Sequence, residues 1–237
     1  MDDIIPDPPV ILAPMAGITD LPFRRLALRL GAGLVVSEMI ASEDMLAARR
    51  GVREKAALGL GRGGGAERTA VQLAGREACW MAEAARMVAA AGARRIDINM
   101  GCPAKRVTSA RGAGASGAAL MRDPDHALSL IEAVVGAVDL PVTLKIRLGW
   151  DAASRNAPEL ARRAEEAGVR MITVHGRTRC QFYEGHADWA AIGAVRAAVG
   201  IPVIANGDIT GPACAVRALA LSGGHGVMIG RAARGRP

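Results

Sequence analysis

Short apolar runs alternate with Ala-rich stretches along the whole chain, and this alternation limits the possible folds more than any other feature. The strand-like runs are 10–17, 34–39, 69–74, 95–101, 142–149, 171–176, 202–207 and 226–232. Helices are predicted near 20–31, 43–50, 77–91, 124–136, 157–167, 187–199 and 211–221, two of them opened by proline after Asp123 and Gly211. Eight regular strand units joined by crossovers predict an α/β fold, a closed parallel TIM (β/α)8 barrel, rather than an open doubly wound sheet.

The chain ends at Pro237, directly after the last strand-like run. Because each barrel strand is normally followed by a helix, we expect the final covering helix to be missing. A chain of 237 residues with 51% hydrophobic content can bury one core, so residues 1–237 are predicted to form one domain.

Composition excludes several protein classes. No apolar run is long enough to span a membrane and the start, "MDDIIPDPPV", is no signal peptide, so we expect a cytoplasmic protein without membrane contact. The cysteines, at 79, 102, 180 and 214, have no CxxC spacing and no histidine at ligand spacing, which argues against a metal site or a disulfide framework. The net charge of +7 favours a polyanionic partner, although an Arg-rich composition can also reflect genome bias.

Polar residues stand where nearly every predicted strand ends, and the ends of parallel barrel strands meet at one mouth. We therefore expect an active site there. The last two strand ends, "ANGDI" and "MIGRAA", combine small residues with Arg231 and favour a phosphate site, the alternative for each being a simple tight turn. The polar strand ends are Pro14 to Gly17, Ser37 to Met39, Gln72, Asn99 to Cys102, Lys145, Arg147, His175, Arg177, Asn206 to Asp208, Gly230 and Arg231.

Lys145 lies among apolar neighbours inside a predicted strand, where an unpaired ammonium would be costly. Its partner is either an inward carboxylate, Asp97 or Glu38, or the negative N1–O2 edge of a reduced flavin. In the flavin reading, Gln72 would bond the pyrimidine edge of the ring, and His175 would hold that edge or the phosphate.

Two glycine-rich stretches and two histidines are not predicted to form a functional site, and the role of Cys102 is open from its position alone. "GAGASG" (112–117) follows no strand and is predicted to be a mobile loop rather than a dinucleotide motif, and "GRGGGAER" (61–68) a connector. His126 is placed on a helix surface and His225 at the opposite rim of the barrel. By itself the Cys102 thiol is either a small buried apolar group or a ligand, redox, nucleophilic or acidic group.

The chain resembles the tRNA-dihydrouridine synthases, in particular their bacterial B-type branch. The resemblance runs from about residue 9 to 237. Its motifs, in order, are "APMAGITDLPFR", "VSEM", "VQLAG", "DINMGCPAKRV", "LKIRLGW", "VHGRTRCQFYEGHADW", "VIANGDI" and "MIGRAARGRP".

The resemblance implies reduction of tRNA uridines to dihydrouridine, with bound FMN delivering hydride to uracil C6, NADPH as electron donor and Cys102 as the proton donor to C5. A thiol suits this role because it is mostly protonated at neutral pH and can still release its proton. The flavin-contacting positions are Pro14, Met15, Ala16, Gln72, Lys145, His175, Asn206, Gly207, Asp208, Gly230 and Arg231.

For the tRNA, the resemblance suggests that Asn99 orients the uracil. Tyr183, the only tyrosine in a chain with six aromatic residues, is a candidate contact for a base or the flavin. The target base would have to be flipped out of its stack. Basic residues at the mouth would hold flanking phosphates, the alternative for each being a solvated surface position: Lys105, Arg106, Arg147, Arg177 and Arg179. Lys105 and Arg106 are expected on a mobile loop.

Members of this family continue into a helical C-terminal domain that this sequence lacks. We therefore expect the chain to bind FMN weakly or normally and to modify tRNA poorly. We also expect a monomer. Two alternatives are an FMN enzyme acting on a free pyrimidine and a non-catalytic RNA-binding or regulatory relative; the basic mouth argues against the first and the intact Cys102 and Lys145 against the second.

Overall fold

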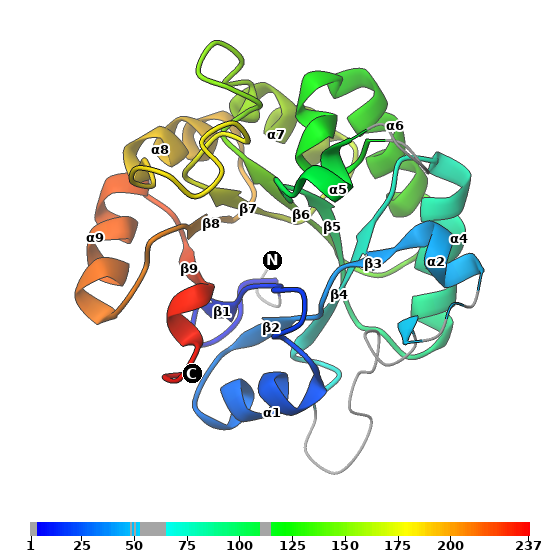
Figure 1. Cartoon of the computed structure of the whole chain (residues 1–237), viewed down its shortest axis with the longest axis horizontal. Coiled ribbons are helices and arrows are strands. Elements are labelled where there is room, and N and C mark those ends of the chain that lie inside the picture. The colour runs from blue at the N-terminus through cyan, green and yellow to red at the C-terminus, as the bar shows by residue number, and fades with distance from the viewer. Residues whose placement is uncertain (1–3, 48, 50, 53–64, 110–114) are drawn as a thin grey trace.

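Eight parallel strands close into a barrel in the computed structural model, which describes residues 4–47, 49, 51–52, 65–109 and 115–237. The strands form a ring with the helices outside it (Figure 1), and β2 pairs with β4 to complete the closure. The predicted TIM barrel is confirmed. Its strands are β1 (Val10–Leu12), β2 (Leu34–Val36), β4 (Thr69–Ala74), β5 (Ile96–Met100), β6 (Val142–Arg147), β7 (Met171–His175), β8 (Val203–Asn206) and β9 (Gly226–Ile229).

Each predicted helix has a counterpart, and three are capped at the N-terminus by aspartate. The carboxylates of Asp20, Asp123 and Asp188 accept hydrogen bonds from the backbone N–H three residues later, which satisfies a donor that the helix leaves open. The helices are α1 (Leu21–Arg29), α2 (Ser42–Leu46), α4 (Ala78–Ala90), α6 (Pro124–Val135), α7 (Ala157–Glu166), α8 (Trp189–Ala198) and α9 (Pro212–Ser222).

The observed strands other than β4 are shorter than the predicted runs, mainly at their C-terminal ends. Residues 13–17 follow β1 without pairing as strand, and β9 passes into a 3-10 turn, η2 (Arg231–Ala233). These segments leave the sheet and line the pocket described below. The short elements that the sequence did not predict are β3 (Ile40–Ala41), α5 (Lys105–Thr108), η1 (Gly117–Arg122) and η2; they span too few residues to show a period.

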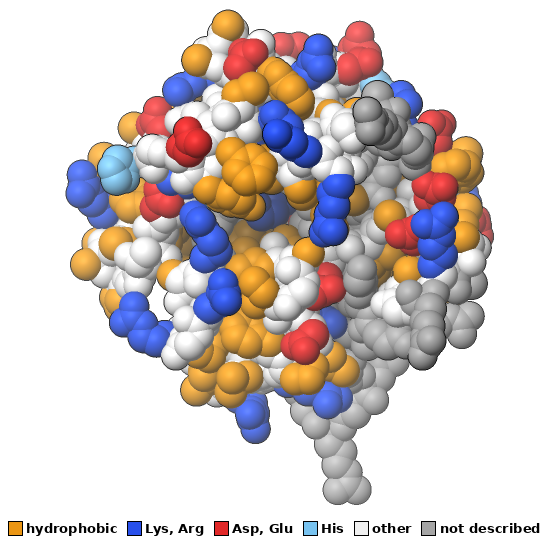
Figure 2. Space-filling view, viewed as in Figure 1, with side chains coloured by type: hydrophobic (Ala, Val, Ile, Leu, Met, Phe, Trp, Pro, Cys, Tyr) orange, Lys and Arg blue, Asp and Glu red, His pale blue; other side chains and the backbone are white. Residues whose placement is uncertain are grey.

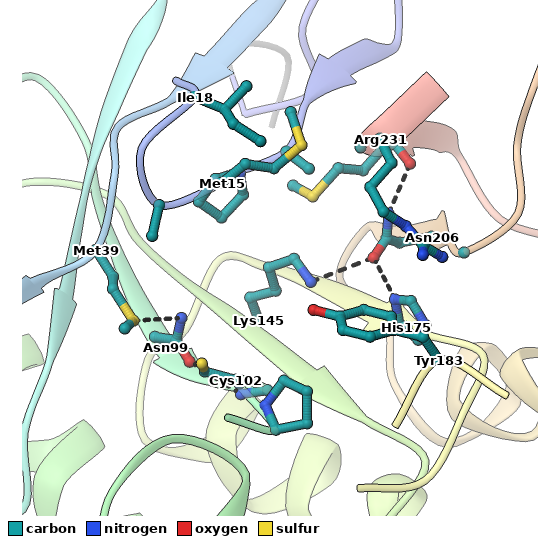
Figure 3. Close-up of a pocket in the computed structure, with 18 of the residues that line it drawn as sticks. Met15, Ile18, Met39, Asn99, Cys102, Lys145, His175, Tyr183, Asn206 and Arg231 are labelled. Carbon is teal, nitrogen blue, oxygen red and sulfur yellow. Dashed lines mark hydrogen bonds between the residues drawn. The ribbon is translucent and has the colours of Figure 1, made fainter. Parts of the chain in front are cut away.

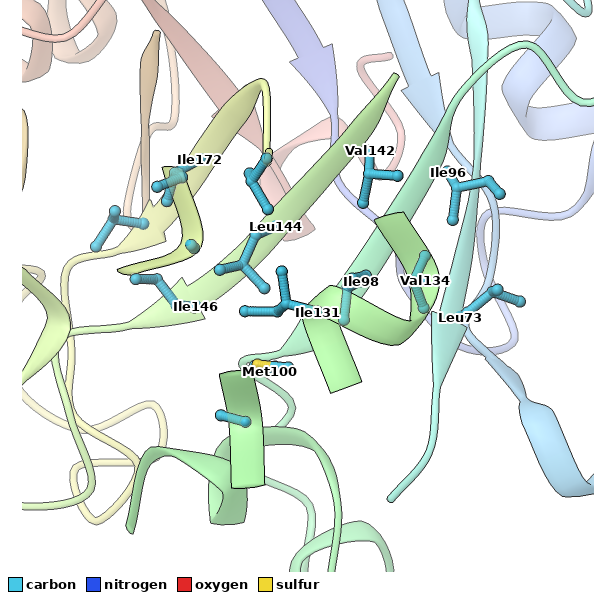
Figure 4. Packing of buried hydrophobic residues seen from close by; sticks show 14 of the residues in the cluster. Leu73, Ile96, Ile98, Met100, Ile131, Val134, Val142, Leu144, Ile146 and Ile172 are labelled. Atoms are coloured by element: carbon cyan, nitrogen blue, oxygen red, sulfur yellow. The ribbon is translucent and has the colours of Figure 1, made fainter. Parts of the chain in front are cut away.

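Side chains alternate along the strands, and the outward set forms the main core. Ile96, Ile98 and Met100 of β5 pack outward with Leu144 and Ile146 of β6 against the helix layer (Figure 4). The barrel interior holds a second, smaller apolar cluster that includes Ile4, which precedes β1, together with residues from six strands.

The remaining inward positions of the central strands are polar. Asp97 and Asn99 alternate with the outward residues of β5, and Thr143, Lys145 and Arg147 do so on β6. The barrel therefore places a polar layer next to the mouth at its C-terminal end. Among the described residues no helix is long and apolar enough to cross a membrane.

Candidate functional site

A cavity of about 680 Å³ opens at the C-terminal ends of the strands, within the size range of small-molecule and cofactor sites. Figure 2 shows the hollow at the centre of this face, with Lys and Arg side chains at its edges. Sequence-predicted residues that line it are Pro14, Met15, Ala16, Gln72, Asn99, Cys102, Arg106, Lys145, Arg147, His175, Tyr183, Asn206, Gly207, Asp208, Gly230 and Arg231. Lys105, Arg177 and Arg179 are not among its lining residues.

Cys102 is half-buried in the loop after β5, and this loop is held from two directions. The side-chain oxygen of Asn99 accepts hydrogen bonds from the backbone N–H of Gly101 (3.2 Å) and Cys102 (3.0 Å). On the other side, Gly117 has φ +58°, and a Cβ there would lie 2.9 Å from the Cys102 carbonyl oxygen, so only glycine fits.

The predicted mobile loop at 112–117 falls partly outside the described residues, at 112–114. Its remainder is tied down, because the N–H of Ser116 donates to Val107 O (2.9 Å) and the next turn donates from Ala118 N to Cys102 O (3.0 Å). The predicted connector at 61–68 likewise lies outside the described residues at 61–64.

A chain of buried hydrogen bonds runs from the Cys102 loop into the barrel. Asn99 Nδ2 donates to Gln72 Oε1 (2.8 Å), and Gln72 Nε2 donates to Asp97 Oδ2 (2.7 Å). Thr143 Oγ1 donates to the other Asp97 oxygen (2.6 Å). Burial raises the pKa of Asp97, while the bonds from Thr143 and Gln72 favour its ionised form. We call Gln72, Asp97, Asn99 and Cys102 the Cys102 wall.

Lys145, His175, Arg177 and Asn206 make up the opposite side, which we call the Lys145 wall. Figure 3 shows Lys145 and His175 converging on Asn206, away from Asn99 and Cys102. Lys145 Nζ donates to Asn206 Oδ1 (3.2 Å) and, within the described part of the chain, lies within 4.0 Å of no carboxylate. Burial, followed by repulsion from Arg147, lowers the pKa of Lys145 from 10.5 to about 8.

The alternative in which Lys145 pairs with an inward carboxylate is therefore wrong. Asp97 binds Thr143 and Gln72 instead, and Glu38 Oε1 accepts a hydrogen bond from Gly17 N (2.7 Å). The cation is left with one acceptor, Asn206 Oδ1, and faces the cavity.

The turn after β8 brings backbone close to His175. Gly207 has φ +111°, and a Cβ there would lie 2.8 Å from the Ala187 Cβ and 3.4 Å from the His175 ring. The next residue, Asp208, accepts hydrogen bonds from Arg177 Nη2 (2.6 Å) and Ala187 N (2.7 Å). The carboxylate thus fixes this turn to the loop that follows β7.

Arg147 and Arg177 are buried, so the structure supports neither the predicted phosphate contacts nor a solvated surface position for these two residues. Each is 2% exposed. Arg147 donates to the carbonyl oxygens of Gly101, Thr178 and Phe182 at 2.8 to 2.9 Å. Arg177 donates to the carbonyl oxygens of residues 184 and 185 and to Asp208. Both guanidinium groups therefore join loops inside the protein, where long fork-shaped donors satisfy several carbonyls at once.

Lys105 and Arg106 are exposed as expected, but they lie on the one-turn helix α5 rather than in a loop. Arg179 is half-buried; it donates from Nη2 to Thr108 Oγ1 (2.9 Å), and its guanidinium carbon lies 4.7 Å from the Trp150 ring centroid. None of these three cations has a carboxylate within 4.0 Å in the described ranges.

Tyr183 stands at the mouth between two guanidinium groups. The guanidinium carbon of Arg231 lies 4.6 Å and that of Arg147 5.6 Å from its ring centroid, distances typical of cation–π contacts. Phe182, which the sequence reasoning did not select, meets the ring edge to face at 4.7 Å and is 40% exposed. The adjacent aromatics of "QFY" in a chain with 3% aromatic residues were the available signal.

His126, in the first turn of α6, is half-buried rather than on the surface, whereas His225 directly precedes β9 at the other end of the barrel, as predicted. The four cysteines are free. No group of three or more His, Cys, Asp or Glu residues that could hold a metal ion occurs in the ranges that the structure describes.

Residues 11–237 match the family model described as "Dihydrouridine synthase (Dus)". The chain is 67% identical over 237 residues to a "Probable tRNA-dihydrouridine synthase" of Rhodobacter capsulatus, covering all of this chain and 71% of that protein. It is 59% identical to one from Rhizobium leguminosarum bv. phaseoli, covering 96% and 69%. It is 52% identical to "tRNA-dihydrouridine synthase B" of Pseudomonas putida, covering 96% and 65%.

Among solved structures, a mandelate oxidase superposes with a TM-score of 0.61 at 24% identity, covering 95% of this chain and 65% of that one. A nitroalkane oxidase from Streptomyces ansochromogenes gives a TM-score of 0.51 at 17% identity, covering 94% and 64%. These likenesses show the barrel fold alone. The chain spans slightly less than two thirds of the length of both solved chains.

Proposed function

Because the chain belongs to the dihydrouridine synthase family, we propose that it is a flavin-dependent tRNA-dihydrouridine synthase, an oxidoreductase that reduces a uracil base of tRNA. The observation that carries this proposal is one cavity with the Cys102 thiol on one wall and, on the other, the Lys145 cation, which has no carboxylate partner among the described residues. A proton donor and a site for a negatively charged ring thus face the same space.

The residues present fit FMN. The cavity has the volume of a cofactor site, and the Lys145 ammonium keeps donors for an electron-rich ring because its three N–H groups meet one protein acceptor. Gly230, which has no neighbour closer than 3.7 Å to its Cβ position, leaves backbone uncovered at the end of β9 beside Arg231, as a phosphate requires, and Gly207 lines the cavity at the end of β8. The residues proposed to hold FMN are Pro14, Met15, Ala16, Gln72, Lys145, His175, Asn206, Gly207, Asp208, Gly230 and Arg231.

Reduced FMN would supply the hydride that uracil C6 accepts. The resulting charge at C5 and O4 requires a proton at C5. The Cys102 thiol donates it, and solvent then returns a proton to the thiolate. Asn99 supports this step by holding the backbone of the Cys102 loop, in addition to its proposed contact with the uracil.

The mouth suits an RNA strand. Lys105 and Arg106 are exposed on α5, and Arg179 lies nearby with no carboxylate partner in the part of the chain that the structure describes, so all three are available to phosphates. Phe182 and Tyr183 offer exposed ring surface next to the cavity, where a base flipped from its stack would enter. NADPH as reductant, a monomeric enzyme and a cytoplasmic location complete the proposal.

The test is to incubate the purified chain with unmodified tRNA and NADPH, and to measure the mass gain of two hydrogens per modified uridine. Cys102→Ala should keep the yellow flavin spectrum and lose product by roughly 10²-fold or more, the usual contribution of a general acid. Cys79→Ala, an exposed thiol on α4, is the matched control and should behave like the wild type.

Unchanged turnover by Cys102→Ala would overturn the acid role. A wild-type chain that binds flavin and reduces free uracil but never tRNA would replace the RNA substrate by a small pyrimidine. A chain without flavin would overturn the proposed cofactor.

A further inference from the structure

The orientation of the Asn206 side-chain amide is fixed by a backbone carbonyl. Asn206 is 6% exposed, and its Nδ2 lies 2.7 Å from the carbonyl oxygen of Met228 on the adjacent strand β9. A carbonyl only accepts hydrogen bonds, so the amide nitrogen must face it and the amide oxygen must face the other way. That oxygen points toward the cavity side of the Lys145 wall.

Two nitrogens meet this oxygen. Lys145 Nζ lies 3.2 Å and His175 Nδ1 lies 2.9 Å from Asn206 Oδ1 (Figure 3). The amide oxygen carries no hydrogen, so both contacts are hydrogen bonds only if each nitrogen is the donor. His175 must therefore carry a proton on Nδ1.

The other ring nitrogen faces a group that can only donate. Arg177 Nη1 lies 3.4 Å from His175 Nε2, and the guanidinium is held in place by Asp208 and the carbonyl oxygens of residues 184 and 185. A proton on Nε2 would point at this cation. Burial, with Lys145 and Arg147 next in importance, lowers the pKa of His175 well below 6.5, so the ring is neutral at physiological pH.

We propose that Asn206 is a positioning residue that holds His175 as the neutral Nδ1–H tautomer, with the unprotonated Nε2 toward Arg177, and aims the Lys145 ammonium, so that His175 carries no charge beside the bound cofactor. The part that concerns the cofactor rests on the proposed function. The positive charge that would face the cofactor at this point then comes from Lys145, and His175 adds none.

The first measurement is the tautomer itself. Long-range ¹H–¹⁵N correlation on the full ¹⁵N-labelled chain, with His175→Gln to assign the resonances, should show a protonated Nδ1 and an unprotonated Nε2. Both should stay unchanged from about pH 5.5 to about pH 7.5, on either side of the ordinary histidine pKa of about 6.5 and below the range in which Lys145 titrates. A proton on Nε2, or a doubly protonated ring at neutral pH, would overturn the proposal.

Two variants test whether Asn206 is responsible. Asn206→Leu removes the acceptor, and the two ring nitrogens should move toward intermediate shifts as the tautomers mix. Asn206→Asp keeps an acceptor and adds charge, so His175 should begin to titrate within the same pH range. An Asn206→Leu spectrum identical to that of the wild type would show that another group sets the tautomer and would overturn the proposal. If Asn206→Leu does not fold, Asn206→Asp decides the question, and a His175 that does not titrate in that variant would equally overturn the proposal.

Asn156→Leu is the matched control. Asn156 also donates its side-chain amide to a backbone carbonyl, Met121 O at 2.8 Å, but it contacts neither His175 nor Lys145. Asn156→Leu should leave the His175 resonances unchanged. Shifts as large as those in Asn206→Leu would mean that the spectra report a general loss of packing, and would overturn the assignment of the effect to Asn206.

The consequence for the cofactor is measured separately, by FMN titration of flavin-stripped protein. Loss of one aimed hydrogen bond in Asn206→Leu should weaken FMN binding by up to about tenfold. A wild-type chain that binds no FMN would refute the proposed function and leave the tautomer result standing. Normal FMN affinity in Asn206→Leu would refute the positioning role alone.

Discussion

Side-chain amides form the hydrogen bonds of both the Cys102 wall and the Lys145 wall, but they bind groups of opposite charge: a carboxylate in the first and an ammonium in the second. On the Cys102 wall, Gln72 and Asn99 connect the thiol loop to the buried carboxylate of Asp97. On the Lys145 wall, Asn206 receives the ammonium, and Arg177 stands behind His175. Because Asp97 accepts from the Gln72 amide, the amide oxygens of Gln72 and Asn99 both point toward the Cys102 loop, where the Asn99 oxygen accepts from backbone N–H groups. The cations of the Lys145 wall instead favour a negatively charged ligand in the cavity.

The largest expected effect breaks the Cys102 wall at its base. Asp97→Leu would leave Gln72 Nε2 and Thr143 Oγ1 buried without their acceptor, so we expect the free energy of unfolding to fall by roughly 2–4 kcal/mol. Urea denaturation measures it. Asp125→Leu is the control: Asp125 pairs with Arg163 at 2.6 Å but its side chain is 91% exposed, and its loss should cost less than about 1 kcal/mol. Equal losses would remove the distinction between a buried anchor and a surface pair.

A smaller effect, visible through pH, reports on the Lys145 wall. Because the pKa of Lys145 is lowered to about 8, the unfolded chain binds more protons than the folded one above that pH. The free energy of unfolding of the flavin-free protein should therefore rise with pH relative to Lys145→Met. The rise should reach at most about 2 kcal/mol by about pH 9.5, below the range where Arg147, with its pKa lowered to about 10, also titrates. Parallel stability curves for the two proteins would argue against a strained ammonium.

The smallest effect concerns a contact that joins the two sides of the mouth. Arg179 follows β7 on the Lys145 side and donates to Thr108 of α5 on the Cys102 side. If it also holds a phosphate, Arg179→Ala should reduce the slope of log affinity for tRNA against log salt by about 1. Arg162→Ala, on α7 and paired with Glu166 at 2.6 Å, should leave the slope unchanged, and the two variants can be compared by filter binding. An equal change in both would mean that net charge, and not position, governs binding.

Much of the site followed from the strand pattern. The alternation in "RIDIN" and "TLKIR" places Asp97, Asn99 and Lys145 inside the barrel whatever the loops do, since successive strand residues face opposite sides. The ends of the parallel strands then bring Cys102 and Lys145 to one mouth, because a closed barrel has only one C-terminal edge. These parts of the candidate site could be predicted from sequence.

The partners of these residues could not be predicted in the same way. Arg147 is buried because carbonyl oxygens of residues 178 and 182, in a loop far along the chain, turn toward it. Lys145 donates to Asn206, while Thr143 and Gln72 donate to the two oxygens of Asp97. Such hydrogen-bond pairings depend on the paths of the loops and on which donors lie next to a given acceptor. The local sequence predicts neither.

The sequence by itself determined the barrel, the location of its mouth and the thiol and lysine that face it, because strand period and strand order set these without long-range detail. Only the tertiary structure decided which polar groups are satisfied inside the protein and which stay open. Asn206, Arg147 and Arg177 form hydrogen bonds inside the protein, whereas the Lys145 ammonium retains N–H donors for a ligand. The physical reason is that a buried polar group must find a partner, and the partner is defined by packing across strands and loops.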